Sequence, residues 1–318
     1  GLGDVYKRQD VSILKPGLRM LEEKINTSVL GVIPYFHLDI EDEDSLTERF
    51  RKKSRSGLAK IAVIRLPRIS NFTDIAPLEA VDELDVSYVS NISQFGDPDV
   101  VIIPGSKNTI SDLLWMRQNG LEGKILRHAA KGGIVFGICG GYQMLGQSIS
   151  DPTGAEQKGT VRGMGLLPVT TVFEQEKRRT RVSGRFAKVG GALAEMSGVC
   201  YEGYEIHMGR TVLSKGTVPL VYMEEEGEQR QDGAQSDHVY GCYMHGIFDM
   251  SETVKTFLAA VLRKKGIDPS KITVRDRNAY KEEQYDRLAS IVRENLNMEA
   301  VYKIIEKGNE ASCSLLSE

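Results

Sequence analysis

The stretch GGIVFGICGGYQMLG, residues 132–146, decides the fold. An apolar run from Ile134 to Ile138 passes through Cys139 into a helical pattern, which predicts a strand, a sharp turn and a helix. Glycines two residues before and two residues after the cysteine, Gly137 and Gly141, let strand and helix approach each other around a strained turn. The pattern is typical of a nucleophile elbow that carries sulfur in place of oxygen.

Cys139 is therefore expected to project from the tip of this turn at the start of a helix. The unpaired N–H groups and partial positive charge found there favour a thiolate, which can attack an amide. The alternative is that Cys139 is a small buried residue in a glycine-rich turn. A phosphate-binding loop fits less well, because the chain contains no G-x-x-x-x-G-K-[ST] string.

A cysteine nucleophile needs a base, and His245 is the best placed of the five histidines. His245 lies where a strand-like run ends, directly before the glycine turn at Gly246. The carboxyl edge of a parallel sheet is where Cys139 and His245 could meet. His207 competes for this role, but its pattern is more typical of a structural histidine hydrogen-bonded inside a sheet.

Short apolar runs alternate with helical patterns through the middle of the chain. Strand patterns lie at Ile61–Leu66, Val100–Ile103 and Ile134–Ile138, and a helical pattern at Asn108–Lys131 separates the last two. This order predicts an α/β fold with a mostly parallel central sheet flanked by helices, because parallel strands need a crossover connection. Later apolar runs at residues 165–173, 204–208 and 239–244 extend this sheet or add a second one.

Three regions are expected along the chain. Residues 1–56 comprise a ragged leader, Gly1 to Gln9, and the end of a preceding domain, with a buried strand over Ser28–Phe36. Residues 57–250 form the main domain. Residues 251–318 form a helical C-terminal extension with helices at 251–264 and 282–307. The charge run from Glu224 to Asp232 is expected to be a solvated loop.

The composition excludes several classes of protein. Hydrophobic residues make up 41% and charged residues 27% of 318 residues, as in globular proteins. A net charge of −3 does not indicate the basic surface that nucleic-acid binding requires. The four cysteines form no C-x-x-C pair and no zinc-like spacing, so we expect no metal and a reducing, cytoplasmic location. No apolar stretch or signal pattern indicates a membrane.

Four segments together resemble the triad-type (class I) glutamine amidotransferases, which have a flavodoxin-like fold, and within them the cobyric acid synthase branch. The segments are residues 66–74 (LPRISNFTD), residues 104–109 (PGSKNT), the Cys139 elbow up to Gly146, and residues 203–209 followed by 243–249. The resemblance covers about Lys60 to Asp249. Val29 to Leu46 also resembles the end of that family's N-terminal ATP-using synthetase domain.

The resemblance implies a reaction and a set of site residues. Cys139 would attack the side-chain amide of L-glutamine, and His245 would shuttle the proton while a glutamyl thioester forms and ammonia leaves. Backbone N–H groups of Gly105 and Gly140 would form the oxyanion hole. Gln143 and Ser106 would contact the substrate.

Two parts of the site stay open at this point. Many relatives carry a glutamate two residues after the histidine, where this chain has Ile247. Glu205 and Asp249 are the candidates for a third catalytic group, and a Cys–His dyad is the alternative. The segment Asn71–Asp74 is either a loop near the active site or the domain interface, or a turn whose polar side chains cap backbone N–H groups, and turn capping is slightly favoured.

The resemblance also implies partners. ATP and magnesium would bind the family's synthetase domain, whose phosphate loop these 318 residues do not contain, so we expect no cofactor in this chain and no amide ligation by it alone. A synthetase domain or subunit would supply the ATP site. It would also bind the corrinoid acceptor, adenosylcobyrinic acid a,c-diamide, in cobalamin biosynthesis.

Two alternatives remain. One is amidation of another acceptor, in cobyrinic acid diamide formation or on a peptidoglycan precursor. The other is a catalytically silent module that keeps the elbow fold and only binds a partner.

Overall fold

The computed structural model describes residues 11–36, 38, 57–225, 228–271 and 277–315. The chain divides into two compact units: unit 1 comprises Gly1–Asp42 and Asn278–Glu318, and unit 2 comprises Glu43–Arg277. The expected leader, Gly1 to Gln9, lies outside the described residues. The expected boundary at residue 250 does not separate the units, because helix α8 (Ser251–Lys264) packs within unit 2.

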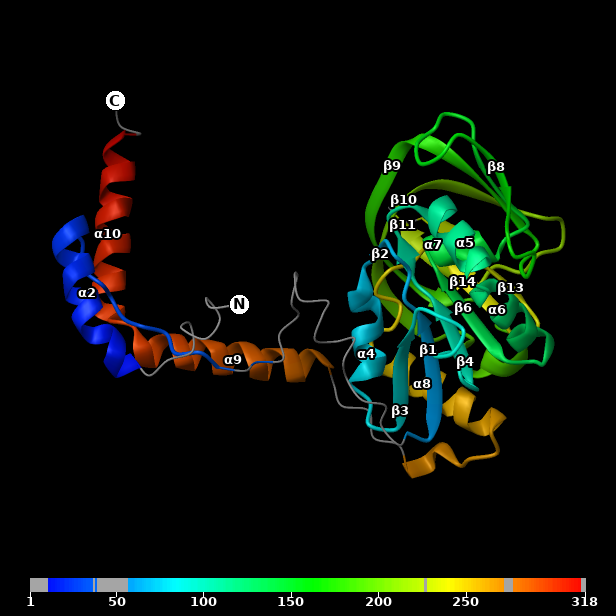
Figure 1. Cartoon of the computed structure of the whole chain (residues 1–318), viewed down its shortest axis with the longest axis horizontal. Helices are drawn as coiled ribbons and strands as arrows, with labels where there is room; N and C mark the ends of the chain where they lie inside the picture. Colours follow the sequence, from blue (N-terminus) through cyan, green and yellow to red (C-terminus); the bar gives the residue numbers. More distant parts are fainter. Residues whose placement is uncertain (1–10, 37, 39–56, 226–227, 272–276, 316–318) are drawn as a thin grey trace. The chain divides into compact units, whose positions relative to one another are not determined.

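The central sheet of unit 2 has six strands in the order β13-β14-β6-β4-β1-β3 (Figure 1). Neighbouring strands from β14 to β3 are parallel, and β13 is antiparallel to β14. All residues of β4 and β6 are buried, as expected for a parallel sheet covered on both faces. The strands are β1 (Ala59–Ile64), β3 (Leu84–Val89), β4 (Val100–Ile103), β6 (Ile134–Ile138), β13 (Ala234–Ser236) and β14 (Val239–Cys242).

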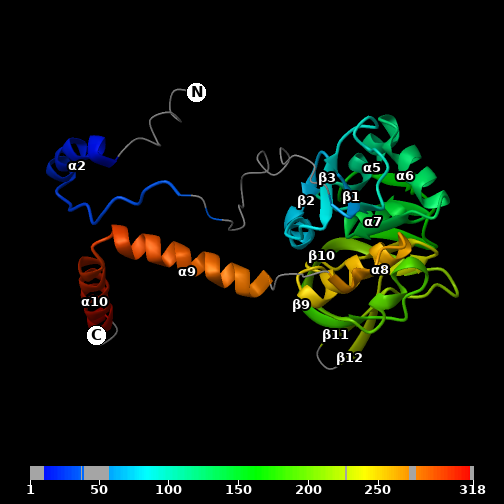
Figure 2. The ribbon, with the colours of Figure 1, turned by 90° about the horizontal axis from the view of Figure 1, so that it is seen from below.

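Helices cover both faces of this sheet. In Figure 2, α5 (Thr109–Gln118), α6 (Leu121–Ala130) and α7 (Gly140–Leu145) lie on one side of it and α8 on the other. The helical pattern at 108–131 forms two helices, not one, because Gly120 adopts a left-handed conformation with φ of 80° between them. Phe257 of α8 packs edge-on against Phe248 in the core. The α/β architecture predicted from the strand and helix pattern is confirmed.

Short elements connect the central sheet to the region of Cys139. Strand β2 (Ile69–Ser70) follows β1 and pairs with β5 (Gly105–Ser106), which follows β4. The 3-10 helix η1 (Phe72–Ile75) and helix α4 (Ala76–Glu79) come directly after β2.

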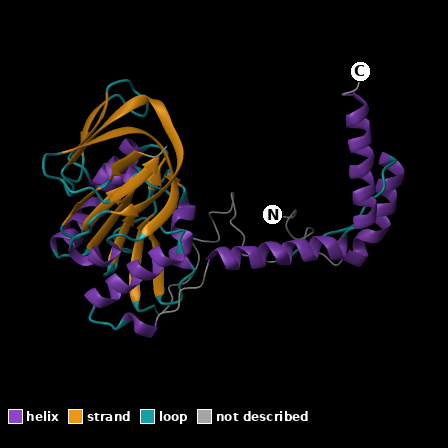
Figure 3. Cartoon of the chain, turned by 180° about the vertical axis from the view of Figure 1, so that it is seen from behind, coloured by secondary structure: helices purple, strands orange, loops and turns teal. Residues whose placement is uncertain are grey.

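A second, largely antiparallel sheet completes unit 2, with the order β12-β11-β9-β7-β8 and β10 paired to β9 (Figure 3). The sequence predicted that the later apolar runs extend the first sheet or add a second one, and both occur. Strand β14 extends the first sheet, while β9 and β10 belong to the second. Its strands are β7 (Ser148–Asp151), β8 (Gly159–Arg162), β9 (Val169–Phe186), β10 (Cys200–Leu213), β11 (Val221–Glu225) and β12 (Glu228–Asp232); the 3-10 helices η2 (Gly191–Met196) and η3 (Pro269–Lys271) also belong to unit 2.

The expectation of a loop at Glu224–Asp232 is wrong for the residues that the structure describes, and residues 226–227 lie outside them. Strand β11 up to Glu225 pairs antiparallel with strand β12, Glu228–Asp232. Asp232 is buried, with 6% of its surface exposed. Alternation in a strand turns every second side chain inward whatever its charge.

The described part of unit 1 consists of α2 (Val11–Ile25), α9 (Arg277–Asn295) after its first residue, α10 (Met298–Leu315) and the extended segment after α2. The expected buried strand at Ser28–Phe36 is absent from these described residues; Gly31 alone forms a bridge, to Leu296. The helix expected at 282–307 is broken between α9 and α10. Among the described helices, none combines the length and the apolar character that crossing a membrane requires.

Candidate active site

Cys139 lies at the turn between β6 and α7, where the predicted elbow is observed. Its backbone has φ of 51° and ψ of −107°, a strained conformation for a residue other than glycine. A Cβ atom added at Gly141 would lie 1.9 Å from the Ile103 carbonyl oxygen, and one added at Gly137 would lie 2.7 Å from the Tyr142 nitrogen. The two glycines therefore allow the close approach of strand and helix that the sequence predicts.

His245 reaches the same edge of the sheet from the neighbouring strand. Strand β14 runs parallel to β6 with Cys242 beside Ile138, and the Cys139 N–H donates to the Cys242 carbonyl at 2.8 Å. Cys139 and His245 thus leave adjacent parallel strands at their carboxyl ends. Both are buried, with exposed fractions of 7% and 1%.

Asp74 binds the imidazole of His245. Its Oδ2 lies 2.7 Å from Nδ1 of His245, and its Oδ1 accepts the Gly246 N–H at 2.9 Å. Asp74 is 2% exposed and comes from η1. The structure therefore places Asp74, which the sequence analysis quoted only as part of the segment 66–74, in the position expected for a third group.

Neither carboxylate that the sequence suggested occupies this position. Glu205 lies on strand β10 and forms an ion pair with Arg230. Asp249 follows the turn after His245, and its backbone N–H donates to the Gly246 carbonyl. With Nδ1 of His245 bound to Asp74, the expectation of Glu205 or Asp249 as its partner is corrected.

The surroundings of His245 favour its protonated form. Burial lowers the pKa of His245, but hydrogen bonds with Asp74 and Cys139 and the negative charges of both groups raise the pKa more, to about 10. Because Nδ1 is bound to Asp74, Nε2 is the ring nitrogen available to the sulfur. The arrangement therefore favours a protonated imidazole beside the sulfur of Cys139 at neutral pH.

The ring of His245 is also held by β10 and by the loop before η1. Tyr204 stacks on it with a centroid distance of 5.3 Å, and the backbones of the two residues exchange hydrogen bonds of 3.1 and 2.9 Å. Asn71 donates from Nδ2 to the Tyr204 hydroxyl. Of the two interpretations of Asn71–Asp74, these contacts support a loop beside the site, although Asp74 does also accept a backbone N–H.

The family comparison agrees with this geometry. The model of the CobB/CobQ-like glutamine amidotransferase domain matches residues 60–253. The chain belongs to this family.

Curated relatives extend the match beyond the amidotransferase domain. Cobyric acid synthase of Ruminiclostridium cellulolyticum is 54% identical over 307 residues, covering 95% of this chain and 60% of the relative. Cobyric acid synthase of Lachnoclostridium phytofermentans is 44% identical, covering 95% and 61%, and that of Alkaliphilus metalliredigens is 46% identical, covering 94% and 61%. The chain thus spans about 60% of the length of these relatives.

The two predicted oxyanion donors of the amidotransferase domain lie close together. Gly140 is the first residue of α7, where N–H groups lack acceptors within the helix. A Cβ atom added there would lie 3.0 Å from the Ser106 nitrogen, so residues 105–106 pack against Gly140. A Cβ atom on Gly105 would lie 3.1 Å from Cε1 of His245. Their role as donors stays a prediction.

The side chains of Gln143 and Ser106 have partners within the amidotransferase domain. Gln143 is 2% exposed, not a helix-surface residue; its Oε1 accepts from Thr109 and its Nε2 donates to the Tyr243 hydroxyl, both at 3.1 Å. The Ser106 hydroxyl donates to Asp112 at 2.7 Å. Substrate contacts by these two residues stay predictions.

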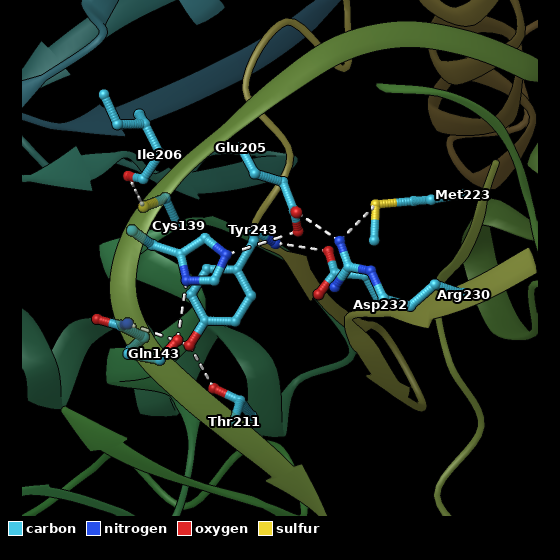
Figure 4. A network of polar contacts seen from close by, with 11 residues as sticks. Cys139, Gln143, Glu205, Ile206, Thr211, Met223, Arg230, Asp232 and Tyr243 are labelled. Atoms are coloured by element: carbon cyan, nitrogen blue, oxygen red, sulfur yellow. Dashed lines mark hydrogen bonds and ion pairs between the residues drawn. The ribbon is translucent and has the colours of Figure 1, made fainter. Parts of the chain in front are cut away.

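A second polar group, the His207 cluster, comprises His207, Glu205, Arg230 and Asp232, and its two carboxylates are buried. Figure 4 labels Glu205, Arg230 and Asp232. Nδ1 of His207 donates to the Gly209 carbonyl at 2.8 Å, and Nε2 lies 3.6 Å from Glu205. Burial, with the charge of Glu205, raises the pKa of Asp232 to about 6. His207 is therefore hydrogen-bonded inside the sheet, as the sequence favoured.

Proposed function

We propose that the amidotransferase domain hydrolyses L-glutamine and delivers ammonia to an ATP-using synthetase of the cobyric acid synthase type. One observation carries the proposal. Cys139 and His245 leave adjacent parallel strands at one edge, with a buried carboxylate fixed on the far nitrogen of the imidazole. This is the arrangement of a nucleophile, a base and an orienting group.

The reaction begins with an imidazolium beside a thiolate. The Cys139 thiolate attacks the carboxamide carbon of glutamine, and His245 donates its proton to the departing nitrogen as the carbon–nitrogen bond breaks. Ammonia leaves and a glutamyl thioester remains. Neutral His245 then removes a proton from water, whose oxygen attacks the thioester; glutamate leaves and the thiolate and imidazolium are restored.

Asp74 and the backbone around Cys139 support these steps. Asp74 fixes the Nδ1–H tautomer of His245, so that Nε2 faces the sulfur, and it stabilises the imidazolium. The N–H groups at Gly140 and Gly105 are the proposed donors to the tetrahedral oxyanion, and each is worth about 3 kcal/mol of transition-state stabilisation.

The acceptor and the ATP chemistry belong to a partner in this proposal. The relatives named cobyric acid synthase support a corrinoid carboxylate as acceptor. This chain has no G-x-x-x-x-G-K-[ST] string, and its described residues hold no group of three His, Cys, Asp or Glu side chains fit for a metal ion. The proposal assigns the ATP and magnesium chemistry to the synthetase.

A reducing, cytoplasmic location is also part of the proposal. It is supported by the free thiols of Cys139, Cys200 and Cys242.

Glutamate release from glutamine tests the proposal, with the wild type compared with Cys139→Ser and with the matched control Cys200→Ser, whose thiol is exposed. We expect Cys139→Ser to lower kcat by at least about 10³-fold and Cys200→Ser to leave it unchanged. No glutamate release by the wild type, with the synthetase present, would indicate a silent module, and equal release by the wild type and Cys139→Ser would exclude Cys139 as the nucleophile.

The acceptor needs a separate assay. With a synthetase, ATP and magnesium added, the proposal predicts amidation of adenosylcobyrinic acid a,c-diamide. Amidation of cobyrinic acid or a peptidoglycan precursor in its place would keep the glutaminase and overturn the acceptor.

A further inference from the structure

The backbone between strand β14 and His245 leaves the central sheet and needs new hydrogen-bond partners. Strand β14 ends at Cys242, so the N–H of Tyr243 lies beyond the strand. This N–H donates to Oδ2 of Asp232 at 2.8 Å. Buried N–H groups are almost always paired, and here a buried side chain takes the place of a neighbouring strand. Asp232 therefore holds the chain two residues before the proposed base.

The backbone after Asp232 brings its carboxylate close to the end of β14. Gly233 has φ of 73°, a conformation that favours glycine. A Cβ atom added to Gly233 would lie 2.4 Å from the Gly241 carbonyl oxygen and 2.9 Å from Cβ of Cys242. The sequence Asp-Gly at this position thus allows strand β12 to end directly against β14.

The side chain of Tyr243 connects this anchor to the residue predicted to bind glutamine. Its hydroxyl accepts the Nε2–H of Gln143 at 3.1 Å and lies 2.6 Å from the hydroxyl of Thr211 (Figure 4). Its ring stacks on His207 with a centroid distance of 3.7 Å. A shift of the Tyr243 backbone would therefore also move the hydroxyl that holds Gln143. Through this one tyrosine, Asp232 acts on the glutamine site.

Two carboxylates anchor the segment that carries His245, and they do so in different ways. Asp74 accepts the Gly246 N–H at 2.9 Å and also binds Nδ1 of the imidazole. Asp232 accepts the Tyr243 N–H on the other side of His245. Because its printed contact is with backbone, Asp232 is expected to affect where groups lie, whereas Asp74 also affects the charge of the imidazole.

The surroundings of Asp232 resist its charge. Burial, together with the charge of Glu205 on β10, raises the pKa of Asp232 to about 6, although the N–H groups of Tyr243 and Gly233 and the charge of Arg230 on β12 lower it. The other titratable groups that face it are Tyr142 of α7, Tyr201 of β10 and Cys242 of β14. Since this pKa lies above the ordinary 3.8, the ionised carboxyl lowers the stability of the fold as pH rises through these two values. A charge that costs stability is typical of a group that serves a site.

We propose that Asp232 is a positioning residue for glutamine hydrolysis: by accepting the Tyr243 N–H, its carboxylate fixes Tyr243 against Gln143 and so sets the affinity for glutamine. This inference rests on the proposed function and on Gln143 as a contact of the substrate. A neutral side chain at position 232 would accept the same N–H less strongly, because hydrogen bonds to charged groups are about twice as strong as neutral ones.

Glutaminase kinetics of Asp232→Asn, with the synthetase present, test this role. At about pH 8 we expect KM for glutamine to rise about 5- to 20-fold and kcat to fall less than about threefold. The urea midpoint should not fall, because the substitution removes a charge that burial disfavours. Asp85→Asn, the same change at a buried aspartate of β3, is the matched control and should leave KM unchanged. An unchanged KM in Asp232→Asn would overturn the inference.

The pH dependence of KM separates the charge of Asp232 from its packing. In the wild type, KM should rise as pH falls through about 6, because the carboxylate takes up a proton and becomes a weaker acceptor. In Asp232→Asn this rise should be absent. A wild-type KM that stays constant between about pH 5 and 8 would overturn the inference without any variant, and so would a rise of equal size in Asp232→Asn.

A double-mutant cycle tests whether Asp232 acts through Tyr243. Tyr243→Phe keeps the backbone N–H but removes the hydroxyl that holds Gln143, so Asp232→Asn should raise KM less than about twofold when added to Tyr243→Phe. Independent effects that multiply would overturn the inference. No glutamate release by the wild type would overturn the proposed function, whereas an active wild type with KM unaffected by Asp232→Asn would overturn this inference alone.

Discussion

Two histidines of unit 2, His245 and His207, each lie beside a buried carboxylate, yet they are bonded differently. Nδ1 of His245 is 2.7 Å from Asp74, which leaves Nε2 for the sulfur of Cys139. Nδ1 of His207 is bound to a backbone carbonyl, and Nε2 faces Glu205 at 3.6 Å. The carboxylate of Glu205 is held by Arg230. A histidine becomes a base when a carboxylate fixes one nitrogen and the reacting atom meets the other.

Replacing each histidine tests this contrast most strongly. We expect His245→Asn to lower kcat for glutamine hydrolysis by about 10²- to 10⁴-fold, because the proton shuttle is lost. His207→Asn is expected to lower kcat less than about tenfold but to reduce the free energy of unfolding by about 1–3 kcal/mol, since buried polar groups lose partners. Steady-state kinetics measures kcat, and urea unfolding measures the free energy of unfolding. A large loss of kcat in His207→Asn and a small one in His245→Asn would show that His207 is the base.

Replacing the two carboxylates gives the next largest difference. Asp74→Asn is expected to lower kcat about 10- to 100-fold, the range for a partner that orients a functional histidine. Glu205→Gln keeps the shape of the His207 cluster and should leave kcat within about threefold of the wild type. It should instead reduce the free energy of unfolding, because the ion pair with Arg230 is lost. A larger kinetic effect from Glu205→Gln would contradict the assignment of Asp74.

The pH dependence sharpens the same comparison. The pKa of His245 is raised to about 10, above its ordinary value, so the stability gained from the imidazolium is fully present below about pH 6.5 and is lost as pH rises through about 10. Asp74→Asn removes a hydrogen bond and a charge that raise this pKa. We therefore expect the upper limb of the kcat/KM profile to move to lower pH in Asp74→Asn and to stay in place in Glu205→Gln. An unmoved limb in Asp74→Asn would contradict the account.

The smallest effects are expected at Tyr204, which stacks on His245, and at Tyr243, which stacks on His207. Tyr204→Phe keeps the ring that stacks on His245 and removes the hydroxyl bound by Asn71, so kcat should fall less than about tenfold. Tyr243→Phe removes one of the two hydrogen-bond partners of Gln143 and should change KM more than kcat, if Gln143 binds glutamine as predicted. Equal effects on kcat and KM in both variants would leave the tyrosines with structural roles alone.

The sequence predicted what depends on local pattern. Strands β4 and β6 and helix α8 have the predicted bounds, because continuous apolar runs and helical spacing define them. The meeting of Cys139 and His245 followed from parallel strands, whose carboxyl ends share an edge. Glycine spacing alone indicated the elbow.

The missed features depend on distant contacts. Asp74 and His245 are 171 residues apart, and Asp74 sits in a single 3-10 turn that no periodic pattern marks. The charge run at Glu224–Asp232 was assigned by composition, whereas its described residues lie in strands because β11 pairs with both β12 and β9. Ser28–Phe36 has an apolar pattern typical of a strand but, in the described structure, forms one bridge at Gly31.

Labelling with a glutamine-like diazo-ketone, followed by mass spectrometry of the modified peptides, tests the central claim most directly. A single adduct on Cys139, absent in Cys139→Ser and formed more slowly in His245→Asn than in His207→Asn, is the predicted result. Labelling of Cys200 or Cys242, or undiminished labelling in Cys139→Ser, would contradict a thiolate at the elbow activated by His245.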